Sequence, residues 1–290
     1  MISRRNFIVT TGLATTAVLA SPSFAFSMKN KEIGLQLYTL RDELTKGVKA
    51  TLEKVAKAGY TNVETYGFST KDQFWGLTPQ ELKKILDENG LKAVSGHYNL
   101  GSFLYDGNTT ELIASIEAAK VLKSEFLTVP WVDEPFRRNI EDYKKIAARV
   151  NEAAKMCEKA GLKLAYHNHD FEFQKYDGVT GYEILLKETD KNLVYFELDL
   201  YWVIHSGNDP LKLFKENPGR FKMWHVKDKD KKNNDLNTEV GSGTIDFKPF
   251  FEAAKQSGMV HFFVEQENNF ASSSFESIQS SWDFISKNLI

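Results

Sequence analysis

Side chains that bind metals or move protons gather where short apolar segments end, in the second half of the chain. Such residues follow four consecutive apolar segments: Tyr166–Glu172 (YHNHDFE), Glu197–Asp199 (ELD), His225–Asp228 (HVKD) and Glu265–Glu267 (EQE). Oxygen and imidazole ligands without thiolates suit Mn²⁺, Mg²⁺, Co²⁺ or Zn²⁺. The sequence therefore predicts a site for one divalent metal ion and does not choose among these four.

The carboxylates of one apolar segment make the strongest case for a cation. Glu197 and Asp199 both lie in Val194–Asp199, and an unpaired charge in an apolar strand is very costly. Taken singly, Asp199, His225 and Glu265 could each be satisfied by a lysine or by the backbone. Taken together, they favour a shared cation.

The elements that must position these residues alternate along the chain. Eight short apolar runs are expected to be strands: 33–38, 62–66, 92–97, 126–129, 163–167, 193–199, 222–226 and 262–265. Segments with apolar residues three and four apart lie between them and are expected to be helices: 48–58, 79–89, 109–122, 140–159 and 247–257. The alternation predicts an α/β fold, a (β/α)8 TIM barrel, whose reactive groups sit at the C-terminal ends of its strands.

Four glycines punctuate this pattern. Gly59, Gly90, Gly161 and Gly258 each stand after a predicted helix and before the next strand, where a helix C-cap needs positive φ. The competing fold, an open doubly wound sheet, carries a glycine-rich phosphate loop after its first strand. The sequence has Tyr38–Asp42 (YTLRD) there, which favours the barrel. No linker divides residues 26–290, so we expect one domain.

Bulk composition excludes some partners. The chain has 290 residues and 42% hydrophobic content, enough for a large core without disulfides, and its single cysteine, Cys157, can form none within the chain. The formal charge of -2, with no basic stripe, argues against nucleic acid. The run Lys227–Lys232 (KDKDKK) mixes signs and is typical of a solvated loop.

The first 25 residues have the character of an export signal. Ser3–Phe7 (SRRNF) places two arginines before the apolar stretch Ile8–Ala20, and Ser23–Ala25 forms a small-x-small cleavage site. The arginine pair resembles a twin-arginine signal; an ordinary secretory signal is the alternative. Both predict a periplasmic protein. The stretch is too short and polar for a stable membrane span. An uncleaved signal that anchors the protein is the alternative.

Sequence motifs along the mature chain resemble those of the xylose-isomerase-like barrel superfamily, the sugar isomerase and epimerase group. The motifs are Gln36–Arg41, Gly59–Glu64, Gly96–His97, Glu197–Trp202, Trp224–Asp228, Gly241–Phe247 and Val264–Glu265. In that family a Glu, an Asp, a His and a second Glu from strands five to eight bind one divalent metal. The resemblance assigns the last three to Asp199, His225 and Glu265.

The first ligand departs from the family pattern. Where many members read Glu-Asn-His, this chain has His167-Asn168-His169, so the ligand is either His167 or Glu172. Family epimerases are thought to use the glutamates of strands five and eight as opposed acid and base groups. The substitution weakens the prediction of such two-base chemistry.

The resemblance implies a sugar isomerase or epimerase that acts through a metal-bound enediolate on a keto-sugar or related small carbohydrate. One alternative is a lyase or dehydratase that expels a β-leaving group from an oxidised sugar or glycoside, as in the inosose dehydratase branch. Another is an exported carbohydrate-binding protein without catalysis. The expected catalytic residues are Glu265, Glu172, His169 and Lys227, the expected metal ligands are His167, Asp199, His225 and Glu265, and the expected substrate-binding residues are His97, Tyr38 and Trp202.

Overall fold

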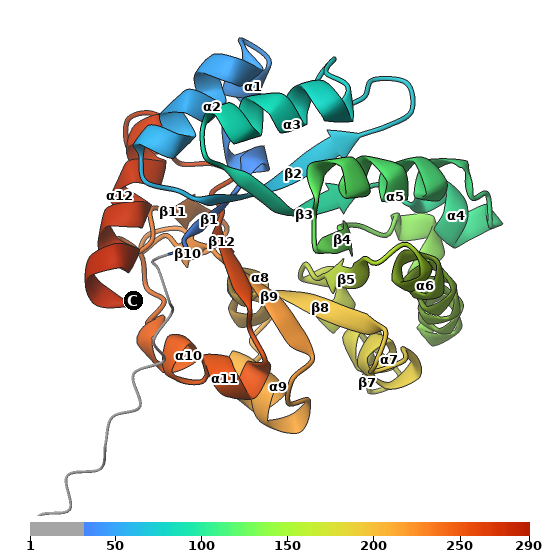
Figure 1. The fold of residues 1–290 in the computed structure, drawn as a ribbon. Helices are drawn as coiled ribbons and strands as arrows, with labels where there is room; N and C mark the ends of the chain where they lie inside the picture. The colour runs from blue at the N-terminus through green and yellow to red at the C-terminus, as the bar shows by residue number, and fades with distance from the viewer. Residues whose placement is uncertain (1–31) are drawn as a thin grey trace, which may run out of the picture.

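Eight parallel strands close into a barrel in a computed structural model that describes residues 32–290 (Figure 1). Around the barrel the order is β1-β12-β9-β8-β5-β4-β3-β2. The strands are β1 (Gly34–Gln36), β2 (Asn62–Phe68), β3 (Lys92–Tyr98), β4 (Phe126–Val129), β5 (Lys163–His167), β8 (Val194–Asp199), β9 (Phe221–Val226) and β12 (His261–Val264). The predicted (β/α)8 architecture is confirmed, and the predicted export signal lies outside the described residues.

Helices cover the outer face of the barrel (Figure 1). They are α2 (Val48–Lys57), α3 (Pro79–Glu88), α5 (Thr110–Leu122), α6 (Ile140–Lys159), α7 (Gly181–Glu188), α9 (Pro210–Glu216), α10 (Lys248–Glu252), α11 (Ala254–Ser257) and α12 (Ser274–Asn288). Shorter pieces follow the strand ends: η1 (Leu37–Leu40), α1 (Arg41–Leu44), α4 (Gly101–Asp106), η2 (Glu134–Phe136), η3 (Phe171–Phe173) and α8 (Leu200–His205). Two hairpins complete the loops: β6 (Lys175–Tyr176) with β7 (Val179–Thr180), and β10 (Asp228–Lys229) with β11 (Asn237–Thr238).

Within residues 32–290, we find no helix with the length and apolarity that a membrane crossing requires. The cysteine, Cys157, is buried in α6, and burial raises the pKa of its thiol to about 12.

Two predicted elements differ from the structure. The first strand was expected to reach Tyr38 but ends at Gln36, because the Gln36 side chain accepts a hydrogen bond from the Tyr38 amide and starts η1. The helix expected over 247–257 is divided at Ala253, where the backbone ψ of 5° leaves helical values.

The barrel interior changes from apolar to charged along its length. Phe126, Ala165, Met223 and Phe263 form a separate buried cluster inside the barrel. Because side chains on a strand alternate between the two faces, the next inward position on β9 after Met223 is His225. The charged residues of the mouth therefore lie directly above an apolar floor that contains no solvent-exposed side chain.

The four predicted helix-ending glycines all have positive φ: 100° at Gly59, 67° at Gly90, 80° at Gly161 and 87° at Gly258. They differ in surroundings. A Cβ on Gly161 would meet no heavy atom within 4 Å, whereas a Cβ on Gly258 would lie 2.7 Å from the Cα of Gly219. Gly258 is thus required by both conformation and space.

This contrast gives a paired test of stability. Gly161→Ala should lower the free energy of unfolding by about 1–2 kcal/mol, the cost of left-handed backbone for a residue with a Cβ. Gly258→Ala should cost clearly more, because the backbone of Gly219 must also move. Urea unfolding of both variants measures the difference, and equal losses would show that crowding at Gly258 is relieved without cost.

Candidate active site

Strand register brings the polar residues of neighbouring strands together at the C-terminal mouth. Asp199 on β8 pairs with His225 on β9, and His167 on β5 pairs with Glu197 on β8. Residues two apart on one strand share a face, so Glu197 lies one level below Asp199. The mouth thus holds two stacked layers of charged side chains.

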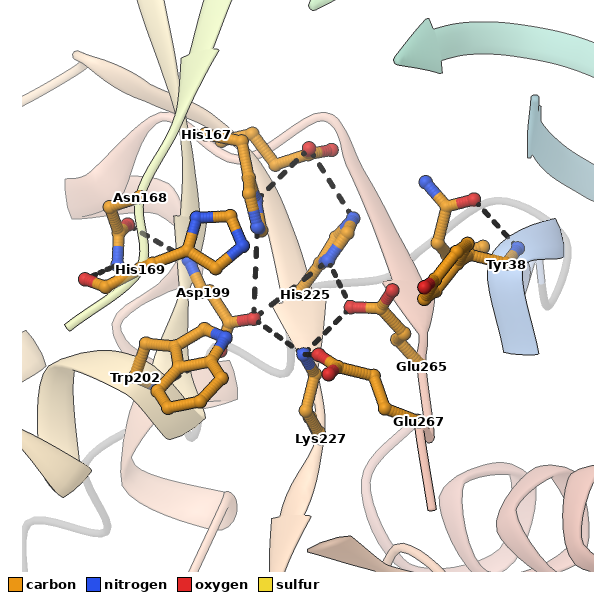
Figure 2. Close-up of polar contacts among 12 residues, drawn as sticks. Tyr38, His167, Asn168, His169, Asp199, Trp202, His225, Lys227, Glu265 and Glu267 are labelled. Atoms are coloured by element: carbon orange, nitrogen blue, oxygen red, sulfur yellow. Dashed lines mark hydrogen bonds and ion pairs between the residues drawn. The ribbon is translucent and has the colours of Figure 1, made fainter. Parts of the chain in front are cut away.

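The outer layer centres on a buried ammonium group (Figure 2). Lys227 Nζ lies 2.8 Å from Glu265 Oε2 and 3.1 Å from Asp199 Oδ2, and it also donates to Glu267 Oε1. His225 Nδ1 is 2.9 Å from the same Glu265 oxygen. We call Asp199, His225, Lys227, Glu265 and Glu267 the outer layer.

Burial and pairing compete at each outer-layer group. Burial opposes the charge on Lys227, but the carboxylates of Asp199, Glu265 and Glu267 outweigh it and raise its pKa well above the usual value. Burial also opposes ionisation of Glu265, but Lys227 and His225 hold its pKa well below its usual range. The pKa of Asp199 is raised because burial there exceeds the effect of Lys227.

The outer layer suits a divalent ion. Asp199, His225 and Glu265 offer ligand atoms that all lie within 4.8 Å of one another. Asp199 Oδ2 is buried and accepts no hydrogen bond from residues 32–290, although Lys227 is nearby. With His225 neutral, as a metal ligand must be, the three carboxylates and one ammonium of the outer layer leave two negative charges, which one divalent ion would neutralise.

The inner layer pairs two carboxylates with imidazoles. Glu64 Oε2 lies 2.7 Å from His225 Nε2 and accepts from Gln36 Nε2 at 2.7 Å, while Ser95 donates to Glu64 Oε1. Glu197 Oε2 lies 2.7 Å from His97 Nε2. The inner layer is Glu64, His97, His167 and Glu197, and His225 contributes its Nε2 atom.

The imidazoles of the inner layer differ in charge. Burial lowers the pKa of His97, but Glu64 and Glu197 outweigh it and raise the pKa to about 9. Burial and the neighbouring His225 lower the pKa of His167 well below its usual value, so His167 is neutral. Burial opposes ionisation of Glu197, yet His225 and His97 bring its pKa to about 2.

The two candidates for the strand-five ligand lie in different places. His167 belongs to the inner layer, and its Nε2 atom is 4.0 Å from Asp199 Oδ2. Glu172 instead accepts hydrogen bonds from the Tyr166 hydroxyl (2.7 Å) and the His169 amide (2.8 Å). This geometry favours His167 over Glu172 as a ligand and gives Glu172 the task of holding the loop after β5.

Asn168 and Trp202 support Asp199. Asn168 Oδ1 accepts from the Asp199 amide at 3.1 Å, and Asp199 Oδ1 accepts from the Trp202 amide at 3.0 Å as the N-cap of α8 (Figure 2). The Asp199 carboxylate therefore has Oδ1 fixed by the start of α8 and Oδ2 directed toward Lys227.

A cavity of about 530 Å³ opens above these layers. Its lining includes all three predicted substrate-binding residues, His97, Tyr38 and Trp202, and the predicted catalytic residues His169 and Glu265. Glu172 is not in the lining, and Lys227 lies beneath it with no exposed surface.

The walls of the cavity differ in chemistry. Glu265 and Glu267, which follow the C-terminal end of β12, line one side of the cavity, and Asp170 also belongs to its lining. Aromatic rings line much of the remainder: Tyr38, Tyr66, Trp131, His169 and Trp202. The Trp131 and His169 rings meet edge to face at 4.8 Å. Aromatic faces of this kind pack against the apolar faces of sugar rings.

Sequence reasoning missed several of these residues. Glu64 and Glu267 stood in the segments Gly59–Glu64 and Glu265–Glu267 singled out in the sequence, but neither residue was assigned a role there. Trp131 and Tyr66 needed the structure, since an aromatic residue near a strand end is equally consistent with packing.

The glycine loop after β9 is a tight turn that binds its own carboxylate. Asp228 accepts hydrogen bonds from the amides of Gly241 and Gly243 through Oδ2 and from Ile245 through Oδ1. A Cβ on Gly243 would lie 2.2 Å from Asp228 Oδ1. The loop is thereby fastened to the end of β9.

Glu172 gives a pH-dependent prediction. Burial raises its pKa to about 7 against an ordinary 4.5, and the hydrogen bonds from Tyr166 and His169 reverse only part of this rise. A raised folded pKa contributes stability that is full below pH 4.5 and is lost as the pH rises through about 7. The free energy of unfolding of the wild type, relative to Glu172→Gln, should therefore fall across this window. Denaturant titrations at several pH values test this, and parallel curves for the two proteins would contradict it.

Comparison with known proteins places the chain in a family. A family model described as "Xylose isomerase-like TIM barrel" matches residues 52–284. An inosose dehydratase from Clostridium botulinum is 27% identical over 259 residues, 76% of this chain and 83% of that protein. One from Lacticaseibacillus casei is 27% identical over 248 residues, 71% of this chain and 77% of that protein.

A crystal structure of a sugar phosphate isomerase/epimerase from Parabacteroides distasonis superposes with a TM-score of 0.78 at 28% identity, covering 89% of this chain and 98% of that one. The closed barrel, its mouth of Asp, His and Glu side chains and the family match lead to one conclusion. The chain belongs to the xylose isomerase-like TIM barrel family.

Proposed function

We propose that this protein is a metal-dependent lyase that eliminates a leaving group from an uncharged carbohydrate bearing a carbonyl group. The main support is that the two sides of the cavity carry different side chains. Its carboxylates Glu265 and Glu267 stand together at the end of β12, while the end of β5 presents His167 and His169. Epimerisation by two opposed carboxylates would need a carboxylate in place of His167 at the end of β5. Glu172 is turned toward Tyr166, and Asp170, which also lines the cavity, lies at an exposed position in the loop beyond β5.

Elimination needs one base and one proton donor. A carboxylate at the β12 side accepts the proton of the C–H bond next to the carbonyl group, and the electron pair of that bond forms a C=C bond. The C–O bond at the next carbon breaks, and its oxygen leaves with the electron pair and gains a proton. The products are an unsaturated carbonyl compound and water or an alcohol.

The residues of the mouth suit these roles. Glu265 or Glu267 would accept the carbon-bound proton. His169 also lines the cavity, and its imidazole would pass a proton to the leaving oxygen. Tyr38, Trp131 and Trp202 would hold the sugar ring and exclude water.

A divalent ion bound by Asp199, His225 and Glu265 would supply Lewis-acid polarisation of the substrate carbonyl. Lys227 would keep the ligand carboxylates Asp199 and Glu265 in place through its two contacts with them. His225 would be oriented by Glu64, whose oxygen lies 2.7 Å from the far ring nitrogen.

The relatives support a reaction on a carbohydrate and divide on its type. The curated relatives named above are inosose dehydratases, which favours elimination. The structural neighbour is named a sugar phosphate isomerase/epimerase, which keeps isomerisation as the second candidate. A non-catalytic carbohydrate-binding role would retain the cavity without turnover.

We also propose that the protein works in the periplasm. The support is the sequence of residues 1–25, with its arginine pair and cleavage site. Finding the expressed full-length chain in the cytoplasmic fraction of its bacterial host would overturn this proposal.

Metal loss gives the first test. Asp199→Asn and Glu265→Gln should each weaken Mn²⁺ binding by about 100-fold or more, because each removes a charged ligand from a three-residue site. Elemental analysis and calorimetric titration measure it. Glu125→Gln is the matched control: Glu125 pairs with His261 at the opposite end of the barrel and should leave Mn²⁺ binding unchanged. Mn²⁺ binding by wild type that survives both substitutions would refute this site.

Reaction type gives the second test. Purified protein loaded with Mn²⁺ is incubated in D₂O with inosose and a panel of keto-sugars. Elimination should produce an ultraviolet-absorbing unsaturated carbonyl product, and Glu265→Gln should abolish it. Deuterium incorporation with a changed sugar configuration and no unsaturated product would select isomerisation, and absence of any turnover would select the binding role.

A further inference from the structure

We infer that the inner layer is a second metal site, with His97, His167 and Glu197 as its ligands. The site lies beneath the outer layer. It goes beyond the proposed reaction and does not depend on which carbohydrate is turned over.

The geometry of the inner layer matches a coordination shell. Glu197 Oε2 lies 2.7 Å from His97 Nε2, 3.4 Å from His167 Nδ1 and 3.3 Å from His225 Nε2. Around Zn²⁺, nitrogen and oxygen ligands at about 2.0–2.1 Å in a tetrahedron lie roughly 3.3–3.4 Å apart. Among the three proposed ligands, the 3.4 Å distance from Glu197 to His167 falls in this range, and the 2.7 Å distance from Glu197 to His97 is a hydrogen bond that an ion would replace.

Two buried atoms in this layer lack partners. His167 Nδ1 and Glu197 Oε1 are buried and form no hydrogen bond with any residue in 32–290. Both belong to side chains with almost no exposed surface. Buried polar atoms are nearly always satisfied by protein, water or an ion, and a cation bound by both residues would satisfy the two at once.

A neutral His167 has one ring nitrogen with a free lone pair, so it can bind a metal ion in only one of the two layers. A neutral imidazole can bind a metal through one nitrogen only. Nδ1 lies 3.4 Å from Glu197 Oε2, whereas Nε2 lies 4.0 Å from Asp199 Oδ2. The outer group, Asp199, His225 and Glu265, is complete within 4.8 Å without His167. The lone pair of His167 is therefore assigned to the inner layer.

His225 separates the two sites. Its Nδ1 atom faces Glu265 in the outer layer, and its Nε2 atom lies 2.7 Å from Glu64. With Nε2–H donating to Glu64, His225 binds only the outer ion. The inner ion then keeps three protein ligands of its own.

Two divalent ions would neutralise the net charge of the two layers. Five carboxylates and one ammonium leave four negative charges, and two divalent ions supply four positive charges with every histidine neutral. The carboxylates are Glu64, Glu197, Asp199, Glu265 and Glu267, and the ammonium is Lys227.

The two sites should prefer different metals. The inner ligands are two imidazoles and one carboxylate, a set that favours Zn²⁺ or Co²⁺ over Mg²⁺. The outer ligands are two carboxylates and one imidazole, which also accept Mn²⁺ or Mg²⁺. Both groups border the cavity, since His97 and His167 of the inner group and Glu265 of the outer group line it.

Metal stoichiometry tests the inference. Chelator-treated full-length protein is loaded with Zn²⁺ or with Mg²⁺, dialysed, and measured by elemental analysis and calorimetry. Wild type should hold about two Zn²⁺ but about one Mg²⁺ per chain. His97→Gln should hold about one Zn²⁺ and bind Mg²⁺ as wild type does, while Asp199→Asn should keep one Zn²⁺ and lose Mg²⁺.

Two results would overturn it: a single Zn²⁺ per wild-type chain, or unchanged zinc content in His97→Gln. The number of Zn²⁺ ions bound by wild type is measured without any substitution, so it does not depend on whether a variant folds. Circular dichroism checks that each variant is folded. Glu197→Gln provides an isosteric second variant with the same expected zinc count as His97→Gln. Failure of the outer site would appear separately, as absent Mg²⁺ binding in wild type with zinc still bound.

Discussion

The contact of Lys227 with three carboxylates is the interaction on which the mouth of the barrel depends. A carboxylate in an apolar interior is tolerated only when a cation or several donors face it. Asp199 and Glu265 come from strands on either side of β9, and the Lys227 ammonium lies between them. Because Lys227 follows directly from β9, the fold itself delivers this charge to the position where the two carboxylates converge.

The layers of the barrel interior follow from strand alternation combined with register. On β8, Glu197 and Asp199 occupy successive inward positions, and on β9 Met223 and His225 do the same. Each strand thereby contributes to more than one level. The apolar cluster around Phe126 and Phe263 excludes water from below, which strengthens every charge interaction above it.

The fold was largely predictable from the sequence because its signals are local. Apolar runs of four to seven residues, helices with apolar spacing of three and four, and glycines at helix ends each act within a few residues. The break at Ala253 was not predictable, since the apolar pattern continues through it. The end of β1 at Gln36 depends on one side chain capping the next turn.

The candidate site was predictable only in part, because it rests on contacts across the barrel. Ligand types at strand ends indicated Asp199, His225 and Glu265, which the structure groups together. The partition between two layers was hidden, because it depends on which nitrogen of His225 faces Glu64, 161 positions away in sequence. Glu172 and His167 looked equivalent in sequence, and only the direction of the Glu172 side chain separates them.

The hydrogen bonds of Asp228 have a consequence for the charge of the substrate. TIM barrels often bind phosphoryl groups with the loops after their seventh and eighth strands. Here the amides of Gly241 and Gly243, in the loop after the seventh barrel strand, already donate to the Asp228 carboxylate. An internal carboxylate thus occupies the position of an anionic ligand, and these amides are not free to hold a phosphoryl group.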